Sequence, residues 1–149
     1  MFQVVREIHF CYGHRLLNYD GKCVHLHGHN GKVEITLQGE KLDDRGMLVD
    51  FGDIKQTINV WIDEHLDHKM LLSKDDPIVP ILQEQGEPLF LMDQNPTAEN
   101  IARLIYDQAV KLGLPVVEVR LWETPKCYAV YRGQTTEDRR RGEPQNIEL

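Results

Sequence analysis

The sequence has few cysteines and no long apolar run, and these two shortages exclude broad classes of protein. Its cysteines are Cys11, Cys23 and Cys127, and a small odd number makes a poor disulfide framework. No apolar run approaches the roughly 20 residues that a helix needs to span a bilayer. Arg6 and Glu7 stand where a secretion signal would carry its apolar segment. We therefore expect a cytoplasmic protein with free thiols and no membrane partner.

Basic residues are also scarce, because 17 lysines and arginines stand against 24 aspartates and glutamates. A nucleic-acid-binding protein normally presents a basic surface, so this balance argues against a nucleic-acid partner. An anionic small molecule stays open as a ligand, since the local charge of a cleft can oppose the overall sign. The 149 residues, 41% of them hydrophobic, can bury a core without disulfides or a structural metal. A bound metal would therefore serve chemistry rather than hold the fold together.

Hydrophobic periodicity predicts a single α+β domain over residues 1–132. Two helical stripes are expected, one beginning at Asp53 with Gln56 at capping-box spacing, the other capped by Thr97. Four segments alternate in the manner of strands: residues 2–10, 32–38, 116–123 and 127–131. This order predicts a four-stranded antiparallel sheet with both helices on one face. Residues 73–96 contain four prolines and predict a long connection, and residues 133–149 predict a polar tail.

Histidines cluster densely in the segment from Cys23 to Asn30. In extended backbone, residues two apart point to the same face, so His27 and His29 would project together on either side of a glycine. Neutral imidazole suits zinc, and three protein ligands with one open position form the usual catalytic arrangement. His14 is a plausible third ligand, and His25, which has the same parity, is a rival to it. The alternative interpretation is a polar loop with surface histidines.

Several other side chains could move protons or bind a ligand, and each has an ordinary alternative. Cys23 could be a thiolate beside a cation, or a small buried hydrophobe. Asp67 could fix the tautomer of His68, or His68 could simply favour the end of a helix. Glu123 continues the apolar face of its strand, so it either accepts N–H groups of a ligand or lies just beyond the buried edge.

The remaining histidines and cysteines of these segments are expected to be structural. His9 is interpreted as a strand residue, and His65 as a satisfied histidine on the apolar stripe of the first helix. Cys11 and Cys127 lie in predicted strands and are expected to be small buried hydrophobes.

Taken together, these motifs resemble the 6-pyruvoyl-tetrahydropterin synthase / 6-carboxytetrahydropterin synthase family. The segment Phe-Cys-Tyr-Gly-His-Arg-Leu matches the family's Phe-x-x-x-His-Arg-Leu element, and a Cys-x3-His-Gly-His-Asn element follows it. The matching segments run in family order up to residue 131: Phe10 to Leu16, Cys23 to Asn30, Val49 to Asp53, Leu66 to His68, Pro96 to Asn100, and Trp122 to Thr124.

The resemblance implies a fold, a chemistry and a role for each matched residue. The fold would be the tunnelling fold, assembled into a multimeric barrel as a homohexamer with sites between subunits. Zinc would bind to His14, His27 and His29. The implied substrate is 7,8-dihydroneopterin triphosphate, with Cys23 as the proton-abstracting thiolate and Asp67 and His68 completing a proton relay from the same or a neighbouring chain. Glu123 would hold the pterin ring, and Thr97 and Glu99 would line its pocket.

The spacing of three residues between Cys23 and His27 resembles the branch that forms 6-carboxytetrahydropterin for queuosine and other 7-deazapurines. The other branch eliminates triphosphate and forms 6-pyruvoyl-tetrahydropterin, and a non-catalytic pterin- or zinc-binding module is the alternative of another class. The chain also departs from the family pattern. Tyr12 and Gly13 replace the usual pair of small residues, and Ala98 replaces a common hydroxyl residue.

Overall fold

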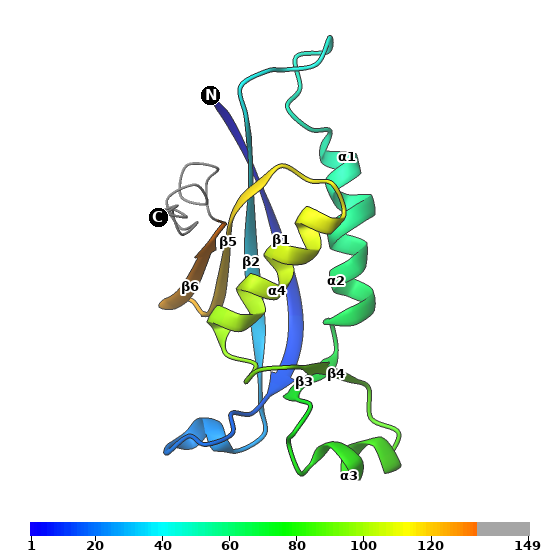
Figure 1. Cartoon of the computed structure of the whole chain (residues 1–149), viewed down its shortest axis with the longest axis vertical. Helices are drawn as coiled ribbons and strands as arrows, with labels where there is room; N and C mark the ends of the chain where they lie inside the picture. Colours follow the sequence, from blue (N-terminus) through cyan, green and yellow to red (C-terminus); the bar gives the residue numbers. More distant parts are fainter. Residues whose placement is uncertain (134–149) are drawn as a thin grey trace, which may run out of the picture.

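A computed structural model describes residues 1–133 as one six-stranded sheet with its helices packed against it (Figure 1). The order of strands across the sheet is β4-β3-β1-β2-β5-β6. The strands are β1 (Phe2–His14), β2 (His27–Gly39), β3 (Lys69–Ser73), β4 (Leu89–Met92), β5 (Val116–Thr124) and β6 (Cys127–Arg132). Residues 134–149, and with them nearly all of the predicted polar tail, lie outside the described residues.

The four predicted strands are confirmed, and they form the antiparallel part of the sheet. β1 pairs with β2 along its whole length, from Phe2 opposite Gly39 to His14 opposite His27. β2 also pairs antiparallel with β5, and β5 pairs antiparallel with β6. Apolar residues at alternate positions of β1 and β2 are buried on one face, as the sequence predicts.

The sheet has two more strands than the sequence predicted. β3 runs parallel to β1, and β4 runs parallel to β3, so the sheet is mixed rather than purely antiparallel. Both strands are short, and β4 lies within residues 73–96, which the sequence predicted to be a long connection. A strand of four or five residues carries too few positions to show an alternating pattern. The connection also contains the short helix α3 (Val79–Glu84).

The first predicted helix starts earlier than Asp53. The carboxylate of Asp50 accepts a hydrogen bond from the backbone N–H of Gly52 at 2.8 Å, so Asp50 is the N-cap. The helix then runs without a break through α1 (Phe51–Ile54), the π-helical segment η2 (Lys55–Asn59) and α2 (Val60–His65). The second helix, α4 (Ala98–Lys111), is capped by Thr97 as predicted.

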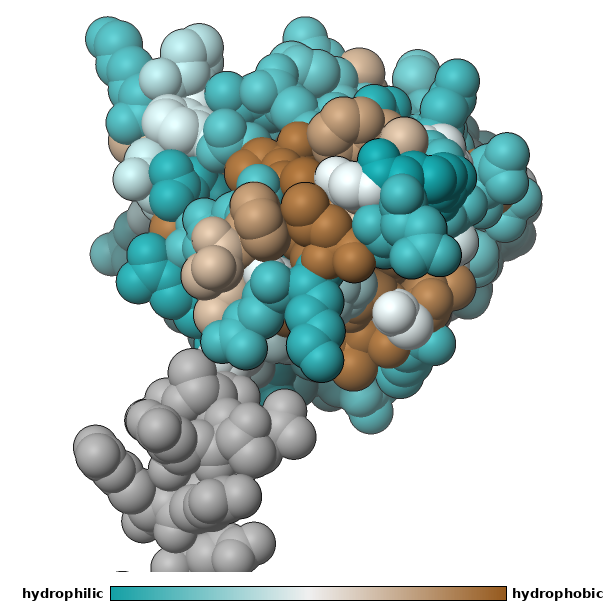
Figure 2. Space-filling model, turned by 90° about the horizontal axis from the view of Figure 1, so that it is seen from above, coloured by the Kyte–Doolittle hydropathy of each residue, from teal (hydrophilic) through white to brown (hydrophobic). Residues whose placement is uncertain are grey.

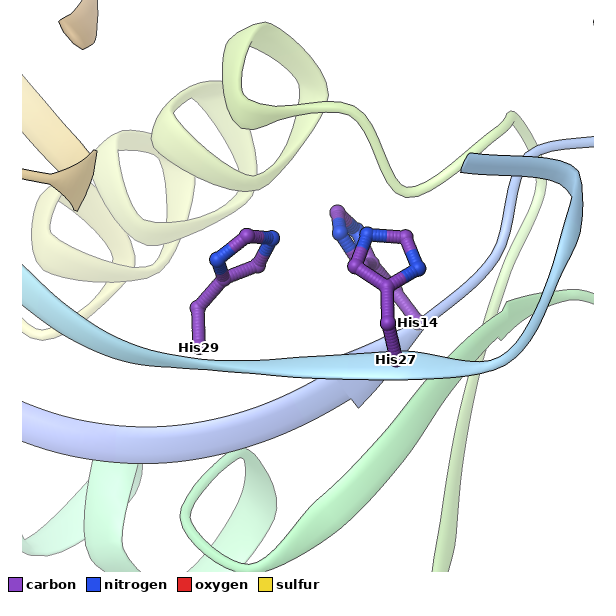
Figure 3. Close-up of side chains that lie close together, drawn as sticks. All are labelled: His14, His27 and His29. Carbon is purple, nitrogen blue, oxygen red and sulfur yellow. The ribbon is translucent and has the colours of Figure 1, made fainter. Parts of the chain in front are cut away.

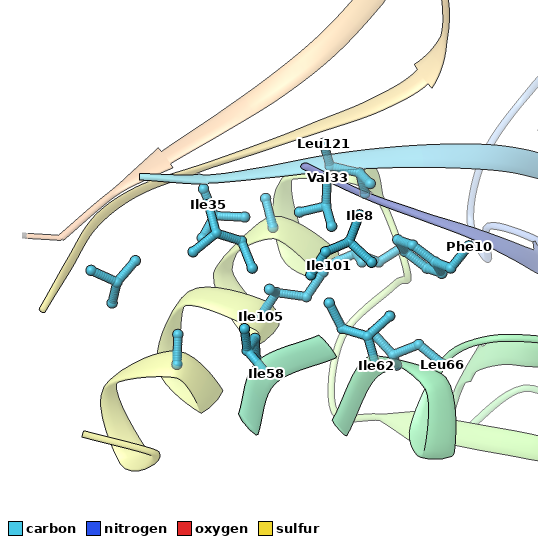
Figure 4. Packing of buried hydrophobic residues seen from close by; sticks show 14 of the residues in the cluster. Ile8, Phe10, Val33, Ile35, Ile58, Ile62, Leu66, Ile101, Ile105 and Leu121 are labelled. Atoms are coloured by element: carbon cyan, nitrogen blue, oxygen red, sulfur yellow. The ribbon is translucent and has the colours of Figure 1, made fainter. Parts of the chain in front are cut away.

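The core lies between one face of the sheet and the helices, which lie on the same side of the strands in Figure 4. Fully buried aliphatic side chains from strands and helices meet there, among them Ile35, Leu121, Ile58, Ile62, Ile101 and Ile105. Burial of this apolar area is the main stabilising contribution to the domain. The core is complete without the histidine cluster, which lies at one end of the sheet.

The opposite face of the sheet is not covered by any helix of residues 1–133. Cys11 and Cys127 are exposed, which contradicts the expectation that both are small buried hydrophobes. Cys11 is exposed because odd-numbered residues of β1 point away from the core. His9 is also exposed, whereas His65 stacks on Trp61 with ring centroids 4.9 Å apart, in keeping with a structural role.

Two further features concern the surface. The end of the molecule seen in Figure 2 carries a cluster of apolar side chains, around a cavity of about 390 Å³ lined by Phe2, Leu42, Met47 and Phe51 among others. No helix among the described residues is both long enough and apolar enough to cross a membrane.

A buried ion pair attaches the end of β1 to the long connection. The guanidinium of Arg15 donates two hydrogen bonds to the carboxylate of Asp76, one of them at 2.7 Å, and the Asp76 side chain is fully buried. Asp76 also accepts a hydrogen bond from the backbone N–H of Ile78. The hydrogen bonds from Arg15 hold the pKa of Asp76 below its ordinary value of 3.8, although burial opposes them.

We expect this pair to make folding stability depend on pH. Because the folded pKa of Asp76 lies below the unfolded one, the pair stabilises the fold fully above about pH 4, and the contribution is lost as pH falls through the folded pKa. An Asp76→Asn variant should be less stable than wild type by about 2 kcal/mol at pH 7. Thermal unfolding from pH 7 to pH 2 should show this gap closing, and a gap independent of pH would contradict the expectation.

Candidate metal centre and adjoining pocket

Three histidines from two paired strands meet at one end of the sheet (Figure 3). His14 ends β1, and His27 and His29 lie at alternate positions at the start of β2, where His14 is paired with His27. Each ring offers one nitrogen, and these three nitrogens all lie within 4.8 Å of one another. The alternation that places the two β2 histidines on one face is the one inferred from the sequence. The set can hold a metal ion.

Hydrogen bonds orient two of these rings toward a common point. Nδ1 of His14 donates to the carbonyl of Pro96 at 2.7 Å, and Nδ1 of His27 donates to the carbonyl of His25 at 2.7 Å. With the proton on Nδ1, the lone pair of Nε2 is free to bind a metal. Burial lowers the pKa of His14 against the opposing effect of the Pro96 carbonyl, which favours the neutral imidazole that metals require.

Nε2 of His14 shows that the residues fit a metal ion. This atom is buried and has no hydrogen-bond partner among the described residues. A buried polar atom without a partner is costly, and a metal ion at the centre of the three rings would satisfy it. Imidazole donors in a set of three with an open position are typical of catalytic zinc.

A carboxylate lies beside the three rings. Oε1 of Glu123 is 3.7 Å from Nε2 of His14, and Oε2 is 3.9 Å from Nε2 of His29. The hydroxyl of Tyr12 donates a hydrogen bond to Oε1 of Glu123 at 2.9 Å. Burial and the neighbouring carboxylate both raise the pKa of Tyr12 above its ordinary value, so the hydroxyl keeps its proton. Glu123 therefore lies beside the histidine cluster and not merely past the edge of the core.

A cavity of about 460 Å³ adjoins the histidines on the same side. Cys23, Thr97, Glu99 and Glu123 all line it, together with His14. Cys23 is half-buried, in the short 3-10 helix η1 (Lys22–Val24), and its carbonyl accepts the N–H of Leu16. The structure thus brings together the predicted thiol, the predicted pocket residues and one metal ligand around one space.

The turn that carries Pro96 and Thr97 is fixed to the segment following β1. The side chain of Asn95 accepts a hydrogen bond from the N–H of Leu17 at 2.9 Å and donates one to the carbonyl of Leu17 at 2.8 Å. The carbonyl of Asn95 accepts hydrogen bonds from Asn100 and from the backbone N–H of Thr97. Asn95 therefore fixes two neighbouring residues relative to the end of β1. They are Pro96, whose carbonyl orients His14, and Thr97, which lines the pocket.

Asp67 and His68 form a hydrogen-bonded pair in a different place. Oδ2 of Asp67 is 2.7 Å from Nδ1 of His68, and Oδ1 accepts the backbone N–H of Cys11 at 2.8 Å. Burial tends to raise the pKa of Asp67, but hydrogen bonds from Cys11 and His68 hold it below its ordinary value. His68 has a positive φ of 55° and an imidazole that is 78% exposed. The pair thus fixes the imidazole's orientation but leaves its outer nitrogen accessible.

Cys23 and His68 line different cavities of one chain, whereas His27 and His29 line the same cavity as His68. His68 lines a second cavity of about 500 Å³, together with Cys11, Asn30 and Lys69. Neither Cys23 nor Glu123 lines that cavity, and neither Asp67 nor His68 lines the cavity beside the metal centre. Of the β1 residues beside these cavities, His14 points to the core face and Cys11 to the open face of the sheet.

His25, the rival ligand in the sequence analysis, is not part of the histidine cluster and contributes only its carbonyl, because it precedes β2 and follows η1. Two other residues of the site could not be found by the sequence analysis. Pro96 contributes a carbonyl, which no side-chain pattern reveals. Tyr12 was noted only as a departure from the family pattern. Its parity with His14 was the one available signal that it faces the metal centre.

The fold and the site together define an α+β protein with a three-histidine cluster that can hold a metal ion, beside a pocket lined by Glu99 and Glu123. Residues 3–134 match the sequence profile of the family described as 6-pyruvoyl tetrahydropterin synthase, and the chain belongs to this family. It is 38% identical to 6-carboxy-5,6,7,8-tetrahydropterin synthase of Rickettsia conorii, across 86% of this chain and 98% of the relative. The corresponding Haemophilus influenzae protein is 31% identical across 89% and 99%.

Solved structures agree with the fold. An uncharacterized protein from Wolinella succinogenes superimposes with a TM-score of 0.74 at 28% identity, over 89% of this chain and 98% of that chain. The 6-pyruvoyl tetrahydropterin synthase of Caenorhabditis elegans superimposes with a TM-score of 0.67 at 23% identity, over 89% and 96%, which supports the fold alone. The tunnelling-fold class expected from the sequence is confirmed.

Proposed function

We propose that the protein is a zinc-dependent 6-carboxy-5,6,7,8-tetrahydropterin synthase. It would convert 7,8-dihydroneopterin triphosphate and water into 6-carboxytetrahydropterin, acetaldehyde and triphosphate, in queuosine and other 7-deazapurine synthesis. The observation that carries the proposal is the buried, unpartnered Nε2 of His14 beside two further histidines and Glu123. The names of the bacterial relatives support the product, since they specify the carboxy branch.

The residues of the site suit separate tasks in this reaction. Zinc on His14, His27 and His29 would act as a Lewis acid that polarises oxygens of the substrate side chain. The half-buried Cys23, as a thiolate, would remove a carbon-bound proton that this polarisation makes acidic. Glu123 has acceptor oxygens facing the cavity, where they can bind the N–H edge of a pterin ring.

The other residues of the pocket would shape the space for the ring. Thr97 and Glu99 line the cavity of about 460 Å³ at the start of α4. The Thr97 hydroxyl accepts the N–H of Asn100 at 3.2 Å, so it is already oriented by the helix that it caps.

We further propose that the active unit is a homohexamer in which each site is completed by two subunits. The support is that His68 and Cys23 line different cavities in one chain, although a proton relay would need both. The exposed residues Cys11 and Asn30 line the cavity with His68, and a second chain would approach the cavity there. A neighbouring subunit would then present its Asp67 and His68 to the cavity that holds Cys23.

Removal and return of the metal tests the proposed zinc dependence. Chelator-treated protein should leave 7,8-dihydroneopterin triphosphate unchanged, and about one zinc per chain should restore its consumption. Substrate loss followed by liquid chromatography measures both states. Full turnover by metal-free protein would refute the proposal. Metal-replete protein that binds a pterin without consuming it would show a non-catalytic binding module.

A further inference from the structure

Tyr12 is built into the metal centre, although the sequence marks it as a departure from the family pattern. Its side chain is buried, and its ring lies 5.3 Å from the ring of His14 and 5.7 Å from that of His29. Gly31 on β2 makes room for this ring, because a Cβ atom there would lie 2.9 Å from Cε1 of Tyr12. The single polar atom of the side chain, the hydroxyl, donates to Oε1 of Glu123 at 2.9 Å.

Glu123 is close enough to the three histidines to compete for the metal. Oε1 lies 3.7 Å from Nε2 of His14, and Oε2 lies 3.9 Å from Nε2 of His29. Both distances are shorter than the 4.8 Å within which the three histidine nitrogens lie of one another. Carboxylate oxygens are ordinary zinc ligands, and a fourth protein ligand would close the site to substrate. The position of this carboxylate therefore decides whether the metal keeps an open coordination position.

We propose that Tyr12 is a positioning residue that holds Glu123 beside the metal rather than on it. The inference rests on the proposed function, in which Glu123 binds the pterin ring and the metal binds the substrate side chain. A buried hydroxyl that donates to one carboxylate oxygen occupies one lone pair of that oxygen and restrains the orientation of the carboxylate. The other oxygen stays available to the ligand in the cavity.

A purely structural role for Tyr12 predicts a different behaviour. The ring stacks on Phe10 with centroids 5.2 Å apart, so it contributes to the core in any case. Tyr12→Phe keeps this ring and removes only the hydroxyl, and it separates the two roles because a packing role would not change the metal centre. Tyr106→Phe is the matched control, since that hydroxyl bonds the carbonyl of Val116 away from the site.

The test uses cobalt(II) in place of zinc and thiocyanate as a probe of the open position. Cobalt reports its coordination through its visible spectrum, and an anion that enters an open position changes that spectrum. Wild-type and Tyr106→Phe proteins should bind thiocyanate with the same affinity. Tyr12→Phe should bind it at least about tenfold more weakly, because Glu123 then occupies the position. The double variant Tyr12→Phe/Glu123→Gln should bind it as wild type does.

The outcomes separate this inference from the proposed function. Weaker thiocyanate binding in Tyr12→Phe, restored in the double variant, would establish the positioning role. A Tyr12→Phe spectrum and affinity identical to wild type would overturn the inference and leave the proposed function standing. A wild-type protein that takes up no cobalt at its histidines would refute both.

Discussion

A His27→Ala variant is expected to lose bound zinc and turnover together while it remains folded. His27 offers one of three nitrogens to the metal, and loss of partners that merely orient such ligands already lowers metal affinity 10–100-fold, as an order of magnitude. Removing a ligand itself should therefore lower zinc affinity by at least about 100-fold. The fold should persist because the apolar core does not depend on the cluster. Zinc affinity from competition with a chelator, and thermal unfolding, measure the two effects.

His25→Ala is the matched control for this prediction. It removes a histidine two residues away but keeps the backbone carbonyl that bonds Nδ1 of His27. This variant should retain zinc and activity. A His27→Ala protein that holds zinc tightly and turns over at the wild-type rate would contradict the ligand assignment, and a zinc-free His25→Ala protein would restore His25 as the rival ligand.

Cys23→Ala and His68→Ala are each expected to be nearly inactive, yet to restore activity in mixed oligomers. Positioned acid–base groups typically contribute a factor of about 100 to 10,000, so each variant should lose at least about 100-fold. Each proposed site takes its thiol from one chain and its imidazole from a neighbour. Random mixing in equal amounts should therefore leave about one site in four with both groups intact.

Co-expression of the two variants with different affinity tags allows the mixed oligomers to be purified and assayed. The control replaces the His68→Ala chain with a Cys23→Ala/His68→Ala chain, which supplies no thiol and should restore nothing. Mixed oligomers as inactive as the separate variants would show that each chain completes its own site. In that case the separation of the two cavities in one chain would need a conformational change to bring them together.

The features of the site that follow from strand alternation could be predicted from the sequence. His27 and His29 lie on one face because they are two apart in a regular strand, and Glu123 shares the buried side of β5 for the same reason. Thr97 could be predicted as a cap because its hydroxyl precedes a helical stripe. Each of these inferences needs only local geometry.

The features that depend on long-range packing could not be predicted. The short strands β3 and β4 exist because they pair with β1, and no local pattern marks them. Asp67 is attached to the backbone of Cys11, 56 residues away, which fixes its position beside β1. The role of Pro96 lies in a carbonyl, and that of Tyr12 in a contact across 111 residues.

Product identity tests the central claim most directly. Zinc-loaded protein should be incubated with 7,8-dihydroneopterin triphosphate under anaerobic conditions, and the products should be identified by mass spectrometry. The proposed function predicts 6-carboxytetrahydropterin with an equal amount of acetaldehyde. Formation of 6-pyruvoyl-tetrahydropterin without acetaldehyde would keep the metal centre but contradict the proposed reaction, and unchanged substrate would contradict catalysis altogether.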